Sequence, residues 1–330
     1  MAGPEHSPLK IGVVGTGAMG RNHVRVLSTL PQAELVGIYD PRREAAEAVA
    51  QEFGQLAFGD LDELAGSIEA AVVAVPTVAH AETGCKLLER GIHVLMEKPL
   101  AGSLAEADRL IEAADRAGRV LAVGHVEYFN PAVQALLGQV AESRAAEAAA
   151  PRFLEVQRLG VFSPRSLDVD VVLDLMIHDL QILHALDPSP VAEVRATGIP
   201  VLSHRVDIAN ARVQLASGGV ANLTASRVSS ERQRKLRAFL PSRYYSLDYQ
   251  GQEIKGYRLE EADGQRRIVP DDVPVERAEP LRRELEAFLA ACRGEDAPRV
   301  DGTAGRQALA TALAILDAIG PDARAVPAGA

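Results

Sequence analysis

The 330-residue chain contains no tryptophan, only two cysteines, and only five lysines among its 35 basic residues. Cys85 and Cys292 belong to no CxxC or Cys/His cluster, which excludes a disulfide scaffold and a thiolate metal site. A net charge of −10 without a basic run argues against binding to nucleic acid or to an anionic membrane surface. No apolar stretch approaches the ~18 residues of a membrane span, and the start MAGPEHSP lacks the features of a signal peptide. We therefore expect a cytoplasmic protein that acts on a small molecule.

The first 125 residues alternate short apolar runs with amphipathic stretches. Strands are predicted at 9–15, 33–40, 56–58, 70–76, 91–99 and 119–125, with helices between them, such as 18–30 and 103–118. Strand and helix that alternate at this spacing are typical of a doubly wound parallel sheet. This part of the chain is predicted to be an α/β domain.

The pattern changes after residue 125. Residues 126–150 are predicted to connect the two domains, and their Ala-rich end, QVAESRAAEAAA, reads as a helix that runs into a boundary near Ala150–Pro151. A helix over about 170–186 follows one strand. Several strands then come in series, with an ASGG hairpin turn between two of them, before two C-terminal helices. We expect an α+β domain over 151–330 with an open, largely antiparallel mixed sheet, whose C-terminal helices could pack back on the domain over 1–125.

The sequence GTGAMG follows the first predicted strand and opens a helix. Gly15 would permit the tight turn, Gly17 the approach of a pyrophosphate, and Gly20 close helix packing. Asp40 ends the second strand, where an acid accepts hydrogen bonds from the adenosine ribose. Strand, loop, helix and acid in register favour dinucleotide binding over a glycine turn without a ligand. The carboxylate favours NAD, while Arg42 and Arg43 keep NADP open as an alternative.

Glu97 and Lys98 close the fifth predicted strand, in the sequence MEKPL. Parallel sheets place ligands at the carboxyl ends of their strands. A lysine at the end of an apolar strand is unfavourable unless it is paired or functional, although a long side chain can also reach solvent. The position makes Lys98 a candidate site residue.

The helix over 170–186 is apolar except for a few positions. Asp174 and His178 are spaced i,i+4 and therefore share one face of the helix. They are either a functional pair or a buried pair whose side chains are hydrogen-bond partners of each other. His184 faces elsewhere and reads as a structural residue. A metal site of Asp174, His178 and Asp179 lacks a further His or Cys at ligand spacing, so we predict no metal.

Taken together, these motifs resemble the Gfo/Idh/MocA oxidoreductases over nearly the whole chain. The resemblance rests on GTGAMGRNH (15–23), AVPTVAH (74–80), EKPL (97–100), VGHVEYFNP (123–131) and DLMIHD (174–179). It implies a Rossmann domain, NAD or NADP, oxidation or reduction of sugar alcohols, and a homodimer or homotetramer formed through the C-terminal sheet. It also implies three catalytic residues, Lys98, Asp174 and His178, and a set of cofactor contacts, namely Gly15, Thr16, Gly17, Ala18, Met19, Asp40, Arg43, Val75, Pro76, Thr77, His80, Glu97, Lys98 and His125.

Two departures from the family pattern resemble the branch that handles UDP-N-acetylglucosamine. VDVVLDLMIHDLQIL replaces the usual glycine-rich lead into the Asp-x-x-x-His motif, and GHVEYFNP carries His125 and Glu127 where Asn and Arg are usual. A nucleotide sugar would need cationic and donor groups besides Lys98, Asp174 and His178. The candidates are Tyr128, Arg165 and Arg227.

The proton of the substrate hydroxyl needs an acceptor near neutral pH. His178 is the first hypothesis for this general base, with Lys98 against the same oxygen and Asp174 as the group that orients and balances the pair. The roles of Lys98 and His178 could be exchanged. A free-sugar or inositol dehydrogenase, an NAD-dependent glycosidase and a non-catalytic cofactor sensor remain alternatives, because a fold does not determine a function.

Overall fold

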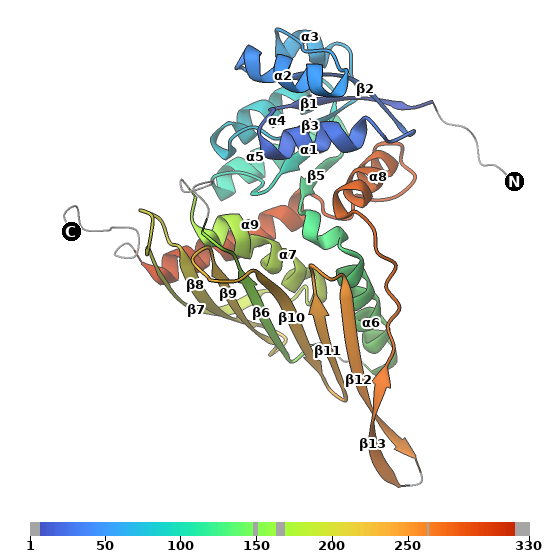
Figure 1. Cartoon of the computed structure of the whole chain (residues 1–330), viewed down its shortest axis with the longest axis vertical. Helices are drawn as coiled ribbons and strands as arrows, with labels where there is room; N and C mark the ends of the chain where they lie inside the picture. Colours follow the sequence, from blue (N-terminus) through green and yellow to red (C-terminus); the bar gives the residue numbers. More distant parts are fainter. Residues whose placement is uncertain (1–6, 148–150, 163–168, 263, 321–330) are drawn as a thin grey trace, which may run out of the picture. The chain divides into compact units, whose positions relative to one another are not determined.

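The computed structural model describes residues 7–147, 151–162, 169–262 and 264–320 (Figure 1). The chain divides into two compact units. The first comprises Met1–Val126 and Glu279–Arg306, and the second Glu127–Ala278 and Gln307–Ala330.

The first unit is built on a parallel five-stranded sheet with the order β2-β1-β3-β4-β5. Its strands are β1 (Leu9–Val14), β2 (Ala33–Tyr39), β3 (Ala70–Val73), β4 (His93–Glu97) and β5 (Leu121–Gly124). Its helices are α1 (Ala18–Leu27), α2 (Arg43–Phe53), α3 (Leu61–Ala65), the 3-10 turn η1 (Thr77–Ala79), α4 (His80–Glu89), α5 (Leu104–Ala117) and α8 (Pro280–Cys292). The doubly wound parallel sheet is confirmed.

The strand predicted at 56–58 is the exception. Among the described residues this segment forms only an isolated bridge, between Ala57 and Ile38, and Leu56 is 67% exposed. The segment lies between Gly54 and Gly59 and is too short to continue a ladder beyond the β2 edge.

Local sequence explains where the helices begin and end. In α5 the Ser103 side chain accepts a hydrogen bond from the backbone N–H of Glu106, which caps the helix start. Gly118 ends the same helix in the left-handed conformation, with φ at +59°. In α3 the Asp60 carboxylate caps the first turn in the same way.

The second unit is built on an eight-stranded sheet with the order β13-β12-β11-β10-β6-β9-β8-β7. Its strands are β6 (Phe153–Leu159), β7 (Val191–Ile199), β8 (Ile208–Leu215), β9 (Val220–Ser226), β10 (Gln233–Leu240), β11 (Arg243–Asp248), β12 (Glu253–Ala262) and β13 (Gln265–Asp271). The β6–β9 pair is parallel and the other pairs are antiparallel. The predicted mixed, largely antiparallel sheet is confirmed.

Helices cover one face of this sheet (Figure 1). They are α6 (Pro131–Glu147), the π-helical turn η3 (Val172–Met176), α7 (Ile177–Leu186) and the part of α9 (Gly302–Ile319) that follows Arg306. The stretch predicted as a connecting segment over 126–150 contains the 3-10 turn η2 (Val126–Phe129) and α6, and α6 contributes Ala132, Val133 and Leu136 to the core of the second unit.

In the part of the chain that the structure describes, no helix combines the length and apolarity needed to cross a membrane. Cys85 and Cys292 are both free.

Candidate active site

The glycine loop between β1 and α1 has the geometry that the sequence predicts. Gly15 has φ at +96°, and a Cβ at this position would lie 2.5 Å from the Ala74 carbonyl oxygen. A Cβ at Gly20 would lie 1.9 Å from the Gly15 oxygen, so a side chain is excluded there. A Cβ at Gly17, by contrast, would meet no atom within 4 Å. Gly15 and Gly20 thus serve the turn and the packing, while Gly17 leaves open space at the start of α1.

Asp40 connects this loop to the end of β2. Its Oδ2 accepts hydrogen bonds from the backbone N–H and the hydroxyl of Thr16, both at 2.9 Å, and its Oδ1 accepts from the Arg42 N–H at 2.9 Å. Burial acts to raise the pKa of Asp40, but these hydrogen bonds outweigh burial and the pKa is lowered. The carboxyl is therefore ionised at neutral pH and still has lone pairs for a ligand hydroxyl.

A cavity of about 660 Å³ lies beside this loop. Of the predicted cofactor contacts, Gly15, Gly17, Asp40, Val75 and Pro76 line it. Tyr39 and Glu82, which also line the cavity, were not predicted, whereas Arg42, named with Arg43 as a possible 2′-phosphate contact, does line it. The remaining lining residues are Val14, Pro41, Leu61, Ala74, Ala79 and Thr83.

Arg43 and Arg42 differ in their neighbours. Arg43 donates to Glu47 one turn further along α2, at 2.7 Å, whereas Arg42 lies 3.3 Å from the Asp40 carboxylate and lines the cavity. Because an i,i+4 glutamate follows Arg43, the sequence itself carried a signal for this ion pair. Ala18 and Met19 stand in the first turn of α1.

His80 joins two segments that the sequence predicts at the cofactor groove. Its Nε2 lies 3.0 Å from the Val75 carbonyl oxygen and its Nδ1 lies 2.9 Å from that of Pro99. Burial lowers the pKa of His80, so the ring is neutral and donates to one of the two carbonyls. Thr77, in the 3-10 turn before α4, is not among the residues that line the cavity.

Glu97 is buried at the end of β4 and is held from two sides. Its Oε1 lies 2.7 Å from Nε2 of His23 on α1, and its Oε2 accepts from the backbone N–H of Lys98 at 3.2 Å. Gly124 on β5 leaves room for this carboxylate, since a Cβ there would lie 3.2 Å from Cδ of Glu97. Glu97 therefore fixes the backbone at Lys98, whose side chain is half-buried.

His125 follows β5 and is fully buried. Burial and the nearby positive charge of Lys98 lower its pKa to about 3. The ring is therefore neutral in the physiological range and is a weak base there.

In the second unit, Asp174 lies in the π-helical turn η3 and His178 in the first turn of α7. Both side chains are half-buried, while their neighbours Met176, Ile177 and Leu180 are fully buried. The predicted helix over about 170–186 is present, but residues 172–176 form a π-helical turn, which is wider than an α-helical one. Such turns recur at functional sites because they alter the direction in which side chains project.

A buried ion-pair network lies beneath this helix. Arg158 of β6 donates to both oxygens of Asp179 at 2.8 Å and to Oε1 of Glu127 at 2.7 Å. The Tyr249 hydroxyl also donates to Asp179, at 3.1 Å. Burial acts to raise the pKa of Glu127, but Arg158 outweighs it and the pKa is lowered. The carboxylate considered as a metal ligand, Asp179, is therefore occupied by Arg158.

The sequence reading missed this network, although a signal for it exists. The alternation of buried Leu154 and Val156 places Arg158 on the core face of β6, and a buried arginine requires carboxylate partners. Glu127, flagged as unusual for its motif, is one of those partners.

The other predicted residues of the second unit lie in different surroundings. Tyr128 is half-buried in η2, and its ring meets that of Phe129 edge-on at 5.3 Å. Arg165 lies outside the described residues. His184 lies 2.8 Å from the Thr311 hydroxyl, and burial lowers its pKa to about 4, in keeping with a structural residue. Arg227 is buried after β9.

Known proteins resemble this chain at several levels. Residues 9–125 match the family described as "Oxidoreductase family, NAD-binding Rossmann fold". A UDP-N-acetylglucosamine 3-dehydrogenase of Acidithiobacillus ferrooxidans is 36% identical over 313 residues, which are 94% of this chain and 97% of the relative. A solved structure of the same name and organism has a TM-score of 0.85 at 37% identity, covering 94% of this chain and 97% of that one.

More distant proteins share the architecture. An inositol 2-dehydrogenase of Paenarthrobacter aurescens is 27% identical over 330 residues, 96% of this chain and 97% of the relative. The structure of a levoglucosan dehydrogenase with NADH and levoglucosan has a TM-score of 0.83 at 20% identity, covering 94% of this chain and 97% of that one, which shows the shared fold.

Fold and glycine loop together define an oxidoreductase with an NAD-binding Rossmann domain. More narrowly, the chain belongs to the Gfo/Idh/MocA oxidoreductase family, as the motifs indicate.

Proposed function

We propose that the protein oxidises the 3-hydroxyl of UDP-N-acetylglucosamine, or of a related UDP-sugar, with NAD. The observation that carries the proposal is the similarity over almost the entire length of both chains to a UDP-N-acetylglucosamine 3-dehydrogenase. The match spans the second unit as well as the Rossmann domain, and the second unit is where the branch-specific departures at Glu127 and over 169–183 lie.

The residues present fit a bound dinucleotide. The open space at Gly17 suits a pyrophosphate at the start of α1, where no side chain caps the helix. Asp40 would hold the adenosine ribose, and its negative charge disfavours a 2′-phosphate. Thr16, which donates twice to Asp40, orients that carboxylate. NAD, when bound, supplies the hydride acceptor for alcohol oxidation.

The protein's own residues would manage the proton. In our proposal His178 takes the proton of the reacting hydroxyl, and Lys98 stabilises the alkoxide that develops. Asp174 orients the histidine and balances the positive charge. Glu97, His23 and the Pro99–His80 contact hold the Lys98 segment in place. Tyr128 remains a proposed contact for the nucleotide sugar, and so does Arg165.

A single-turnover absorbance trace at 340 nm tests the proposal. Near-stoichiometric enzyme is mixed with NAD and UDP-N-acetylglucosamine, with N-acetylglucosamine and myo-inositol in parallel. We expect a rise with the UDP-sugar alone. A rise with myo-inositol or the free sugar, and none with the UDP-sugar, would replace this substrate assignment by the free-sugar alternative.

We also propose a homo-oligomer formed through the helix-free face of the eight-stranded sheet. Phe153, Phe239, Tyr244 and Tyr257 stand directly opposite one another on four neighbouring strands. Their ring centroids are separated by 5.6, 4.9 and 6.4 Å along this row. A contiguous aromatic row on a partly exposed face is typical of a protein–protein interface.

A cytoplasmic location completes the proposal. Free cysteines are typical of reducing compartments, and NAD and nucleotide sugars are cytoplasmic metabolites.

A further inference from the structure

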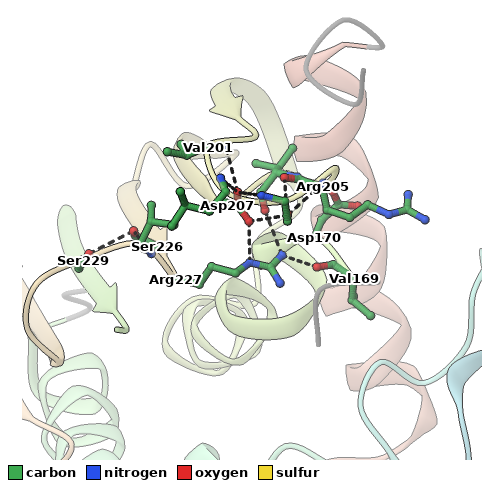
Figure 2. Close-up of polar contacts among 12 residues, drawn as sticks. Val169, Asp170, Val201, Arg205, Asp207, Ser226, Arg227 and Ser229 are labelled. Carbon is green, nitrogen blue, oxygen red and sulfur yellow. Dashed lines mark hydrogen bonds and ion pairs between the residues drawn. The ribbon is translucent and has the colours of Figure 1, made fainter. Parts of the chain in front are cut away.

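Asp207 is a fully buried carboxylate that closes the loop before β8 (Figure 2). Its Oδ2 accepts from the backbone N–H groups of Val201, Leu202 and Ser203 at 2.8, 2.6 and 2.8 Å. Its Oδ1 accepts from the Ser203 hydroxyl at 2.6 Å. Burial acts to raise the pKa of Asp207, but these hydrogen bonds outweigh it and the pKa is lowered, so the group is a buried anion.

Arg227 is the counter-ion of this carboxylate. Its Nε lies 3.2 Å from Oδ1 of Asp207, and its guanidinium donates to the carbonyls of Val206, at 3.2 Å, and Val169. Figure 2 shows the guanidinium between the Asp207 carboxylate and the Val169 carbonyl. The two residues stand next to the paired strand ends Ile208 and Ser226, which fixes their separation. We call Asp207 and Arg227 the hairpin clamp.

The clamp leads directly to the helix that carries Asp174. Val206, beside Asp207, donates its N–H to Oδ1 of Asp170 at 3.1 Å and accepts from the Val171 N–H at 3.0 Å. The Asp170 carbonyl in turn accepts from the N–H of Asp174 at 2.9 Å. Residues at the adjoining ends of β8 and β9 thus hold the start of η3 through hydrogen bonds to the backbone.

Within the described residues, no side chain is seen to cap the start of this helix. The residue at its N-cap, Val171, makes no side-chain cap, and the Asp170 side chain bonds to Val206 instead of to the helix. In the part of the chain that the structure describes, the Asp170 side chain at the helix start is thus bonded to a residue more than 30 positions away in the sequence.

We propose that Asp207 and Arg227 are positioning residues for Asp174 and His178. The inference rests on the proposed function and deepens it, because it assigns Arg227 a role other than diphosphate contact. The Arg227 guanidinium, buried and bonded to a carboxylate and two carbonyls, acts through the helix start and not on the substrate.

Three variants test the clamp: Asp207→Asn, Arg227→Lys and, as the mildest change, Ser203→Ala. Arg195→Met, which breaks an exposed ion pair with Glu193 on β7, is the matched control. Each variant is measured for hydrogen exchange over 169–178, for UDP affinity by calorimetry and for the single-turnover rate. Melting temperatures verify folding.

We expect faster amide exchange at Val171 and Asp174 when the clamp is broken by Asp207→Asn or Arg227→Lys. The affinity for UDP should be unchanged in both variants. The single-turnover rate should fall by about 10- to 100-fold, as expected when reacting groups are displaced by about 1 Å. Ser203→Ala should lower the single-turnover rate by a smaller factor. This variant therefore still tests the clamp if Asp207→Asn does not fold. Arg195→Met should match the wild type.

Two results would overturn the inference. A loss of UDP affinity in Arg227→Lys with none in Asp207→Asn would make Arg227 a ligand contact. Unchanged exchange over 169–178 in both variants would show that the clamp does not hold the helix start. Failure of the proposed function is separate: the wild-type protein would then be inactive on UDP-N-acetylglucosamine, while hydrogen exchange would still decide for or against the clamp.

Discussion

Glu284 of α8 provides a sharp stability prediction. It is 1% exposed, and its two carboxylate oxygens have no hydrogen-bond partner among the described residues. Burial, and next the negative charge of Glu97, raise its pKa well above the ordinary value of 4.5. The titratable groups on α1 are Arg21, His23 and Arg25, and those on β4 are His93 and Glu97. Arg21 pairs with Glu52, Arg25 with Glu279, and His23 with Glu97. We therefore expect Glu284 to keep its proton to a higher pH in the folded protein than in the unfolded chain.

The sign of the effect follows from proton linkage. A carboxyl whose pKa is raised by folding makes its full contribution to the free energy of unfolding at pH values below its pKa in the unfolded chain. That contribution is lost as the pH rises toward the pKa in the folded protein. Each pH unit between the unfolded and the folded pKa lowers the free energy of unfolding by about 1.4 kcal/mol relative to a residue that cannot ionise. Glu284→Gln has nearly the same shape and removes this dependence.

Melting temperatures of wild type and Glu284→Gln, measured from pH 5 to 8.5, test the reasoning. We expect the variant to melt at a higher temperature than the wild type, with a difference that grows as the pH rises. Glu286→Gln, on the exposed side of the same helix, is the control and should show no such trend. Parallel curves for wild type and Glu284→Gln would refute a raised pKa at Glu284.

Three further substitutions test the cofactor site, the role of Lys98 and the oligomer interface separately. Asp40→Ala should weaken NADH binding by about 10-fold in a fluorescence titration, because Thr16 and the ribose lose a charged hydrogen-bond acceptor. The variant should also discriminate less between NAD and NADP. An unchanged affinity for NADH would contradict the role of Asp40. Lys98→Met should slow the single-turnover rate by about 100-fold or more while NADH still binds the cavity near Asp40; wild-type turnover would remove the proposed mechanism. Tyr244→Glu should lower the mass measured by light scattering without loss of β-sheet circular dichroism, and an unchanged mass would exclude the aromatic row as the interface.

The first unit could be predicted from sequence because its signals are local. Apolar runs, glycine at fixed spacing and an acid at the end of a strand determine β1, the loop, α1 and Asp40 within about 40 residues. The predicted strand at 56–58 failed because a short apolar segment at a sheet edge has the same composition as a strand but no partner beyond Ile38.

The second unit was harder because its contacts are non-local. The π-helical turn at Asp174 depends on Val206 and the Asp207–Arg227 pair, and no periodicity within 170–186 reports this. Arg227 had the charge of a substrate contact, and only its burial against carbonyl groups indicates another role. Arg158 could have been recognised from the alternation of β6, whereas the identity of its partners required the fold.

The central claim is hydride transfer from C3 of a UDP-sugar to NAD. The most direct measurement uses UDP-N-acetylglucosamine that carries deuterium at C3, under single-turnover conditions, with mass analysis of the NADH formed. We expect NADH that contains one deuterium and a slower reaction than with the unlabelled sugar. NADH without deuterium would contradict oxidation at C3, and the absence of any NADH would contradict the substrate assignment.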